Sequence, residues 1–92
     1  MNNTFKALAD PTRREILRML SEKSLSAGDI AKAFDISKPS ISHHLNILKT
    51  AELISGDRDG QNIIYSVNAS VMQELVQEIM DLFHVGEEED DS

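Results

Sequence analysis

The chain has 92 residues, no cysteine and a formal net charge of −7. A chain of this length forms one domain and buries only about 60–65% of its unfolded surface, so a second copy would add stability. Disulfides and thiolate metal ligands are excluded, and no apolar run is long enough to span a membrane or to resemble a signal peptide. We therefore expect a cytoplasmic protein without membrane insertion.

The acidic charge is concentrated at the C-terminus, where Glu87 to Asp91 supply five of the sixteen acids. Residues 1–66 carry nine basic and eight acidic residues, a charge of +1. Because phosphate binding depends on local cations, this composition permits a nucleic-acid partner but predicts weak non-specific binding. Residues 87–92 are expected to be a disordered acidic tail, and residues 1–86 the folded domain. The tail either aids solubility or competes with DNA for the basic face.

A short first helix is predicted over residues 3–9, where apolar residues recur at helical spacing: Phe5, Leu8 and Ala9. Asp10 as N-cap and Pro11 at the first helical position start a second helix over residues 11–22. Its apolar face consists of Ile16, Leu17 and Leu20. Two interpretations stay open for its arginines, Arg13, Arg14 and Arg18: a solvated face with Glu15 as partner, or a phosphate contact by one of them.

After a polar loop over residues 22–25, a third helix is predicted over residues 27–34. Ser26 and Asp29 have the spacing of a capping box at its start. The connection 35–37 is short and leads into a capped fourth helix. A short helix, a tight turn and a capped second helix are typical of a helix-turn-helix.

The fourth helix is expected from Ser37, its N-cap, to Ala51, with Pro39 in the first turn. Its apolar stripe consists of Ile41, Leu45 and Leu48. The opposite face is short, polar and cationic, and no acid occurs between Asp35 and Glu52. Such a helix fits a DNA major groove. The alternative is an ordinary amphipathic surface helix.

The period then changes to that of strands. An extended run begins at Leu53, Asp59-Gly60 forms a hairpin turn pair, and residues 61–67 alternate with Ile63, Tyr65 and Val67 on one side. This ribbon is a wing. Arg58 is placed to reach the DNA backbone or minor groove, or else is a solubilising edge charge.

A last helix is predicted over residues 69–84, capped by Asn68 or Ser70. It is apolar over more than half its circumference, so a second surface must cover it. We expect a homodimer through this helix and the first helix. The expected interface residues are Phe5, Leu8, Leu75, Val76, Ile79, Leu82 and Phe83.

Three segments in register, 9–17, 36–45 and 59–67, together resemble the ArsR family of small dimeric winged-helix repressors. The most specific part is Pro-Ser-Ile-Ser-His-His-Leu, residues 39–45, and the chain is closest to a branch of autorepressors. The resemblance implies a mainly α winged helix-turn-helix with a small β-hairpin wing, in which the fourth helix of each subunit reads half of an inverted-repeat operator. The DNA contacts it implies, together with flanking cations, are Lys38, Ser40, Ser42, His43, Asn46, Lys49 and Arg58.

Many relatives sense metals, but this chain departs from their pattern. The thiolate pair of the family sensors falls at Ser26 and Gly28, and only His84 remains of the ligands on the last helix. His43 and His44 are adjacent on a helix and do not converge on one ion. We therefore expect no metal and no other cofactor. The release signal is a small molecule, a sequestering protein partner, or nothing beyond self-limiting expression.

Two other function classes compete with a DNA-binding repressor. One is a winged-helix protein-interaction module that uses its acidic tail on a basic partner. The other is an enzyme built on Ser40, Ser42, His43 and His44, which we do not expect because the local sequence offers no carboxylate to orient an imidazole. His43 reads a base edge or touches only phosphate, whereas His44 borders the apolar stripe and is expected to be structural.

Overall fold

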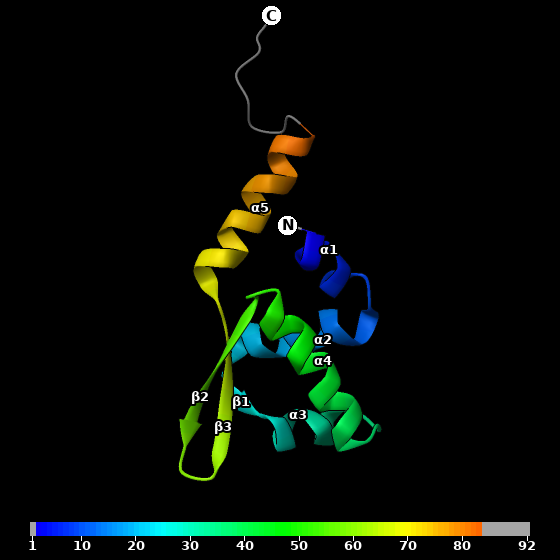
Figure 1. The fold of residues 1–92 in the computed structure, drawn as a ribbon, viewed down its shortest axis with the longest axis vertical. Coiled ribbons are helices and arrows are strands. Elements are labelled where there is room, and N and C mark those ends of the chain that lie inside the picture. The colour runs from blue at the N-terminus through cyan, green and yellow to red at the C-terminus, as the bar shows by residue number, and fades with distance from the viewer. Residues whose placement is uncertain (1, 84–92) are drawn as a thin grey trace, which may run out of the picture.

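The computed structural model describes residues 2–83 of the chain, apart from the Asn2 side chain. The predicted boundary at residue 86, the acidic tail and His84 lie outside the described residues. The elements (Figure 1) follow in the order α1 (Asn2–Leu8), α2 (Pro11–Glu22), β1 (Leu25–Ser26), α3 (Ala27–Ala33), α4 (Lys38–Thr50), β2 (Ile54–Asp59), β3 (Asn62–Val67) and α5 (Ala69–Leu82). None of the described helices is long and apolar enough to cross a bilayer.

Three predicted N-caps are present and explain where the helices begin. The side chain of Asp10 accepts from the backbone N–H of Arg13, which starts α2. Ser26 does the same for the N–H of Asp29 at the start of α3, and Ser37 for the N–H of Ser40 at the start of α4. Each bond satisfies one of the donors that a helix start leaves free. At α5, Asn68 occupies the N-cap position without a side-chain capping bond.

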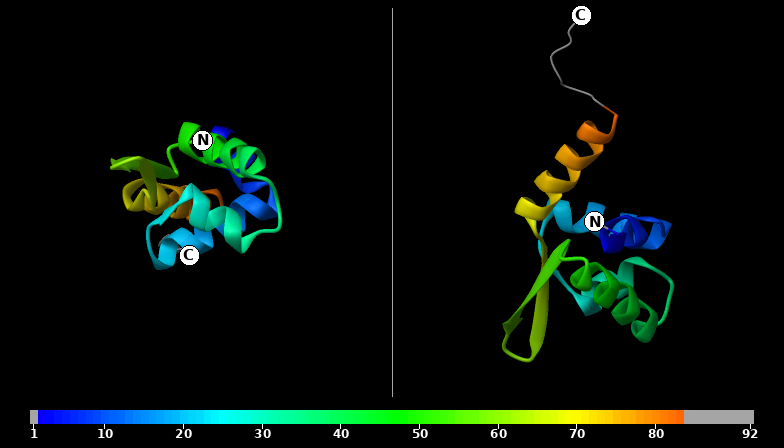
Figure 2. Two further views of the ribbon diagram at one scale, coloured as in Figure 1. Left: turned by 90° about the horizontal axis from the view of Figure 1, so that it is seen from below. Right: turned by 45° about the horizontal axis from the view of Figure 1, so that its top comes forward.

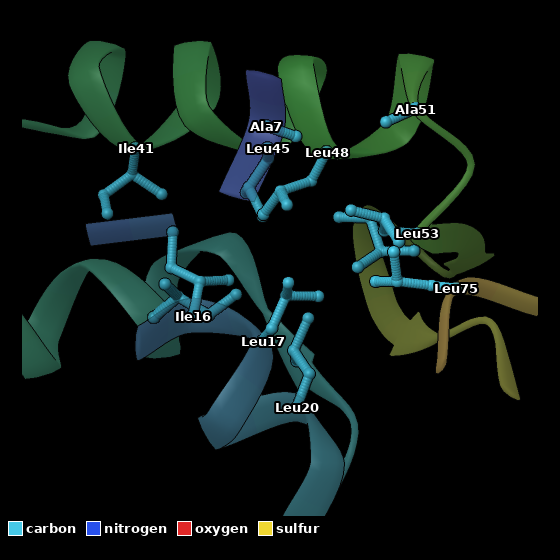
Figure 3. Close-up of a cluster of buried hydrophobic side chains, with 12 residues drawn as sticks. Ala7, Ile16, Leu17, Leu20, Ile41, Leu45, Leu48, Ala51, Leu53 and Leu75 are labelled. Atoms are coloured by element: carbon cyan, nitrogen blue, oxygen red, sulfur yellow. The ribbon is translucent and has the colours of Figure 1, made fainter. Parts of the chain in front are cut away.

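The core lies between α2 and α4. The apolar stripes of the two helices face each other (Figure 3), and the α4 residues Ile41, Leu45 and Leu48 are at most 1% exposed. Leu53 and Leu75 close one side of this cluster. The stripes predicted from helical spacing are therefore confirmed as core.

The sheet has three strands in the order β1-β3-β2, all antiparallel. The short strand β1 was not foreseen: Leu25 pairs with Tyr65 and Ser26 with Ile64, where the sequence predicted only a loop running into a helix. The wing is confirmed, but its turn lies one residue later than predicted. Asp59 pairs with Asn62, so the two-residue loop is Gly60-Gln61, with Gly60 at φ +67°. Glycine at the first position of such a loop is typical of a type II′ turn.

Helix α5 leads away from the other helices, at the end of the molecule opposite the wing tip (Figures 1 and 2). Leu75 is its single buried residue. The large apolar side chains that stay exposed are concentrated on α5 and just beyond it: Val76, Ile79, Leu82 and Phe83, with Phe5 on α1 and Ile36 before α4.

Candidate nucleic-acid interface

The polar face of α4 is exposed, as the sequence predicted. All six candidate DNA contacts on this helix are solvent-exposed: Lys38, Ser40, Ser42, His43, Asn46 and Lys49. Because the opposite stripe is buried against α2, the helix cannot turn this face inward without exposing its core residues. In addition, the Ser37 hydroxyl donates to the Ser40 oxygen at 3.1 Å, so the Ser40 proton remains available to donate elsewhere.

The wing, the start of α3 and α4 together form a groove of about 270 Å³, in which Ser26, Ala27 and Gly28 supply the α3 part of the lining. Lys38 and Ser42 line its α4 side, and Ile63 and Tyr65 line its wing side. Two further polar residues at the wing tip, Gln61 and Asn62, also line this groove. Neither residue was among the contacts predicted from the sequence, although their polar side chains beside a hairpin turn were the available signal.

Arg58 lies on the same face of the wing as Ile63 and Tyr65. It pairs with Ile63, so the two side chains share the sheet face that carries Tyr65 and the buried Ile54. Asp57 and Asp59 lie on the opposite face because side chains alternate along a strand. The exposed Arg58 is thus separated from the two flanking acids.

Arg13 connects three helices. Its Nε donates to the carbonyl of Ala7 at 2.7 Å and its Nη2 to that of Lys6 at 3.1 Å. Its Nη1 lies 3.2 Å from Nδ1 of His44 on α4. Because a guanidinium only donates, this contact requires Nδ1 to accept, which places the proton of a neutral His44 on Nε2. His44 is therefore structural, as predicted.

The other two arginines of α2 have different partners. Arg14 donates to the carbonyl of Leu8, so it also holds the C-terminal end of α1. Arg18 pairs with Glu15 and Glu22 on the exposed side of α2, which confirms the solvated-face interpretation for that residue alone.

A carboxylate does lie beside one of the imidazoles, where the sequence predicted none. Folding brings the Oδ2 of Asp10 to 3.9 Å from Nδ1 of His44. Burial opposes ionisation of Asp10, but hydrogen bonds from the backbone N–H groups of Arg13 and Thr12, together with the positive charge of Arg13, leave the pKa of Asp10 lowered. The carboxylate therefore accepts hydrogen bonds at neutral pH. Since Arg13 contacts the same ring nitrogen, the cluster fixes the positions of helices and does not form a nucleophile–base pair.

The positions of the family thiolate pair do not suit a soft metal ion. The Ser26 hydroxyl accepts a backbone N–H at the start of α3, and Gly28 has no side chain. Among residues 2–83, no group of three or more His, Asp or Glu side chains is arranged to hold an ion.

A helix-turn-helix with an exposed polar second helix, followed by a β-hairpin wing, defines the winged helix-turn-helix class of DNA-binding proteins. The family model for the bacterial regulatory proteins of the arsR family matches residues 10–55, half of the chain. The chain belongs to the ArsR family of transcriptional repressors.

Individual transcriptional regulators are similar to this chain over most of its length. The transcriptional repressor SdpR of Bacillus subtilis (strain 168) is 55% identical over 87 residues, covering 95% of this chain and 97% of that protein. The arsenical resistance operon repressor of Staphylococcus aureus is 33% identical, covering 86% of this chain and 76% of that protein. An ArsR-like transcriptional regulator from Rhodococcus sp. RHA1 superposes with a TM-score of 0.83 at 28% identity, over 90% of this chain and 76% of that one.

These likenesses confirm the predicted family and the resemblance to its SdpR-type branch. They also argue against the enzyme alternative, because the proteins of this family are regulators and not enzymes.

Proposed function

We propose that the chain represses transcription as a homodimer that binds an inverted-repeat operator, and that it regulates its own promoter. The observation that carries this proposal is the division of α4 into a buried apolar stripe and an exposed polar face. Two such helices related by a twofold axis would enter successive major grooves, about 10–10.5 base pairs apart.

The α4 residues then divide by role. Ser42, His43 and Asn46 read base edges, because their short polar side chains are exposed on the face opposite the buried stripe. Lys38, Ser40 and Lys49 on the flanks, with Arg58 on the wing, contact phosphates and set the register. The overall acidity of the chain keeps non-specific binding weak, so discrimination depends on these few contacts.

The test is a fluorescence-anisotropy titration of the protein against a duplex from its own upstream region and against a random duplex at the same salt concentration. The wild type should bind its own region more tightly. His43→Ala should weaken that binding by about tenfold or more, the cost of one good base contact, and affect the random duplex much less. Ser21→Ala, at an exposed position near the end of α2, serves as the matched control and should change neither titration.

Equal losses on the two duplexes would limit His43 to phosphate contact. If the wild type binds the upstream duplex and the random duplex equally tightly, the operator proposal fails. The protein-interaction alternative then takes its place.

The dimer part of the proposal is supported by the exposed apolar residues of α5 and α1. Val76, Leu82 and Phe83 are 54%, 67% and 68% exposed, which is costly for a lone chain in water. Leu8 is half-buried, and Leu75 is only 4% exposed because it packs into the core of its own chain, so Leu75 has little surface left for a partner. The interface we propose therefore centres on Phe5, Val76, Ile79, Leu82 and Phe83.

The proposed release signal is not a thiolate-bound metal, since Ser26 and Gly28 do not suit one. A small molecule, a sequestering protein partner, or self-limiting expression remain the mechanisms consistent with this chain.

A further inference from the structure

A cavity of about 340 Å³ lies between α1 and α4. Lys6 and Arg13 contribute its two cations, and no acidic residue lines it. His43 and Asn46, two of the proposed base-reading residues, form part of the same lining, and Ile47 is its large apolar residue. The volume is that of a small-ligand site, and its charge is positive.

Arg13 supplies this cavity with a cation that is already held in place. Its guanidinium makes three contacts, with Ala7, Lys6 and His44, out of five available N–H donors. Within residues 2–83, Arg13 makes no ion pair with a carboxylate within 4.0 Å. A half-buried arginine that is fixed by neutral acceptors, with donors left over, is prepared to bind an anion at little entropic cost.

The side chain of Lys6 adds a second positive charge to the cavity. Its backbone carbonyl accepts from Arg13, but its side chain is exposed and forms no ion pair among the described residues. Two cations in one lining that contains no acidic residue match the several acceptor oxygens of a phosphate group.

The position of the cavity indicates where this phosphate comes from. A helix with side chains is about 10–12 Å wide and the major groove is about 12 Å wide, so a strand of the DNA backbone passes along each flank of a bound helix. The cavity lies on such a flank, at the level of His43 and Asn46. We propose, on the basis of the proposed operator function, that this cavity binds a backbone phosphate of the operator and that Lys6 and Arg13 are phosphate contacts.

The test measures how binding to the own-promoter duplex and to a random duplex depends on salt. For Lys6→Gln, the slope of log K against log salt should become shallower by about 0.9, the value for one phosphate, equally on both duplexes. Lys23→Gln removes the same charge from an exposed position away from this cavity and should leave the slope unchanged. The Lys6 carbonyl is kept in both variants, so the anchoring of Arg13 is not disturbed.

An unchanged slope in Lys6→Gln, while the wild type still distinguishes the two duplexes, would overturn the inference and leave the operator proposal intact. A second arm titrates the protein without DNA against inorganic phosphate at constant ionic strength and follows the amide resonances of Lys6, Arg13 and His43. If the wild type binds no DNA, shifts that disappear in Lys6→Gln would identify a free phosphate group as the occupant. If Lys6→Gln leaves the salt slope unchanged and phosphate shifts none of these resonances in the wild type, the cavity is not a phosphate site.

Discussion

At the residue scale, two consecutive arginines hold the end of α1. The last carbonyls of a helix have no partner within the helix, and here Arg13 and Arg14 donate to those of Lys6, Ala7 and Leu8. The sequence showed three cations on the second helix, but not that the chain turns back at Asp10 and places Arg13 and Arg14 next to the end of the first helix. The same Arg13 contacts His44, so the end of α1 is joined to α4.

Glu52 is a second residue whose role depends on conformation. It is the only described residue other than glycine with positive φ, at +64°. The backbone N–H of Glu52 donates to the carbonyl of Lys49, and the backbone N–H of Leu53 donates to the carbonyl of Leu48. These two hydrogen bonds form a Schellman motif that ends α4.

Glycine at position 52 should therefore stabilise the protein. Glu52→Gly removes the left-handed strain of a side-chain-bearing residue, partly offset by added flexibility of the unfolded chain, for a net gain of about 0.5–1 kcal/mol. Thermal unfolding at fixed protein concentration should show a Tm about 3–6 °C higher. Glu52→Ala removes the same charge but keeps the strain, so an equal gain in that variant would contradict this explanation.

At the element scale, the wing depends on one close approach between its strands. A Cβ built at Gly56 would lie 2.9 Å from the Cγ2 of Ile63 and 3.1 Å from the Cε1 of Tyr65. Gly56 pairs with Tyr65 across the hairpin, and Tyr65 lines the groove shared with α4. The glycine thus leaves room for the side chains of Ile63 and Tyr65 to lie across β2.

Gly56→Val should push Tyr65 and Ile63 aside and destabilise the protein by about 1–3 kcal/mol, the usual cost of overpacking. Urea denaturation should show a lower midpoint than in the wild type. Ser55→Val, one residue earlier on the exposed side of the same strand, is the matched control and should unfold close to the wild-type midpoint. Equal midpoints for the two variants would show that the wing tolerates a side chain at residue 56.

Strand β1 could not be predicted from the local sequence pattern. Two residues are too few to show an alternation, and Ser26 already had an explanation as the N-cap of α3. Only the return of the chain in β3, about forty positions later, provides Leu25 and Ser26 with partners. The Ser24 and Ser66 hydroxyls, 2.7 Å apart, extend the same association.

At the scale of the whole molecule, α5 and α1 present apolar surface that the rest of the described chain does not cover. For a chain of 10.3 kDa, sedimentation should give a particle of twice that mass. Val76→Lys should produce monomers because it places a charge within the proposed interface.

The matched control is Gln77→Lys, on the neighbouring polar side of α5. Gln77 donates to Asp81, and a lysine there can make the same contact, so this variant should remain dimeric. A monomeric wild type, or a Val76→Lys variant that stays dimeric, would remove α5 from the proposed interface. Such a result would leave α4 without the twofold partner that an inverted repeat requires.

The sequence by itself determined the local structure: helix starts at Asp10, Ser26 and Ser37, the buried stripe of α4, and the wing. These features follow from capping chemistry and from side-chain periodicity, which act over a few neighbouring residues. Only the tertiary structure decided which distant groups meet, namely Asp10 and Arg13 with His44, β1 with β3, and Lys6 with α4. Such contacts depend on how whole elements pack, and no local pattern specifies that packing.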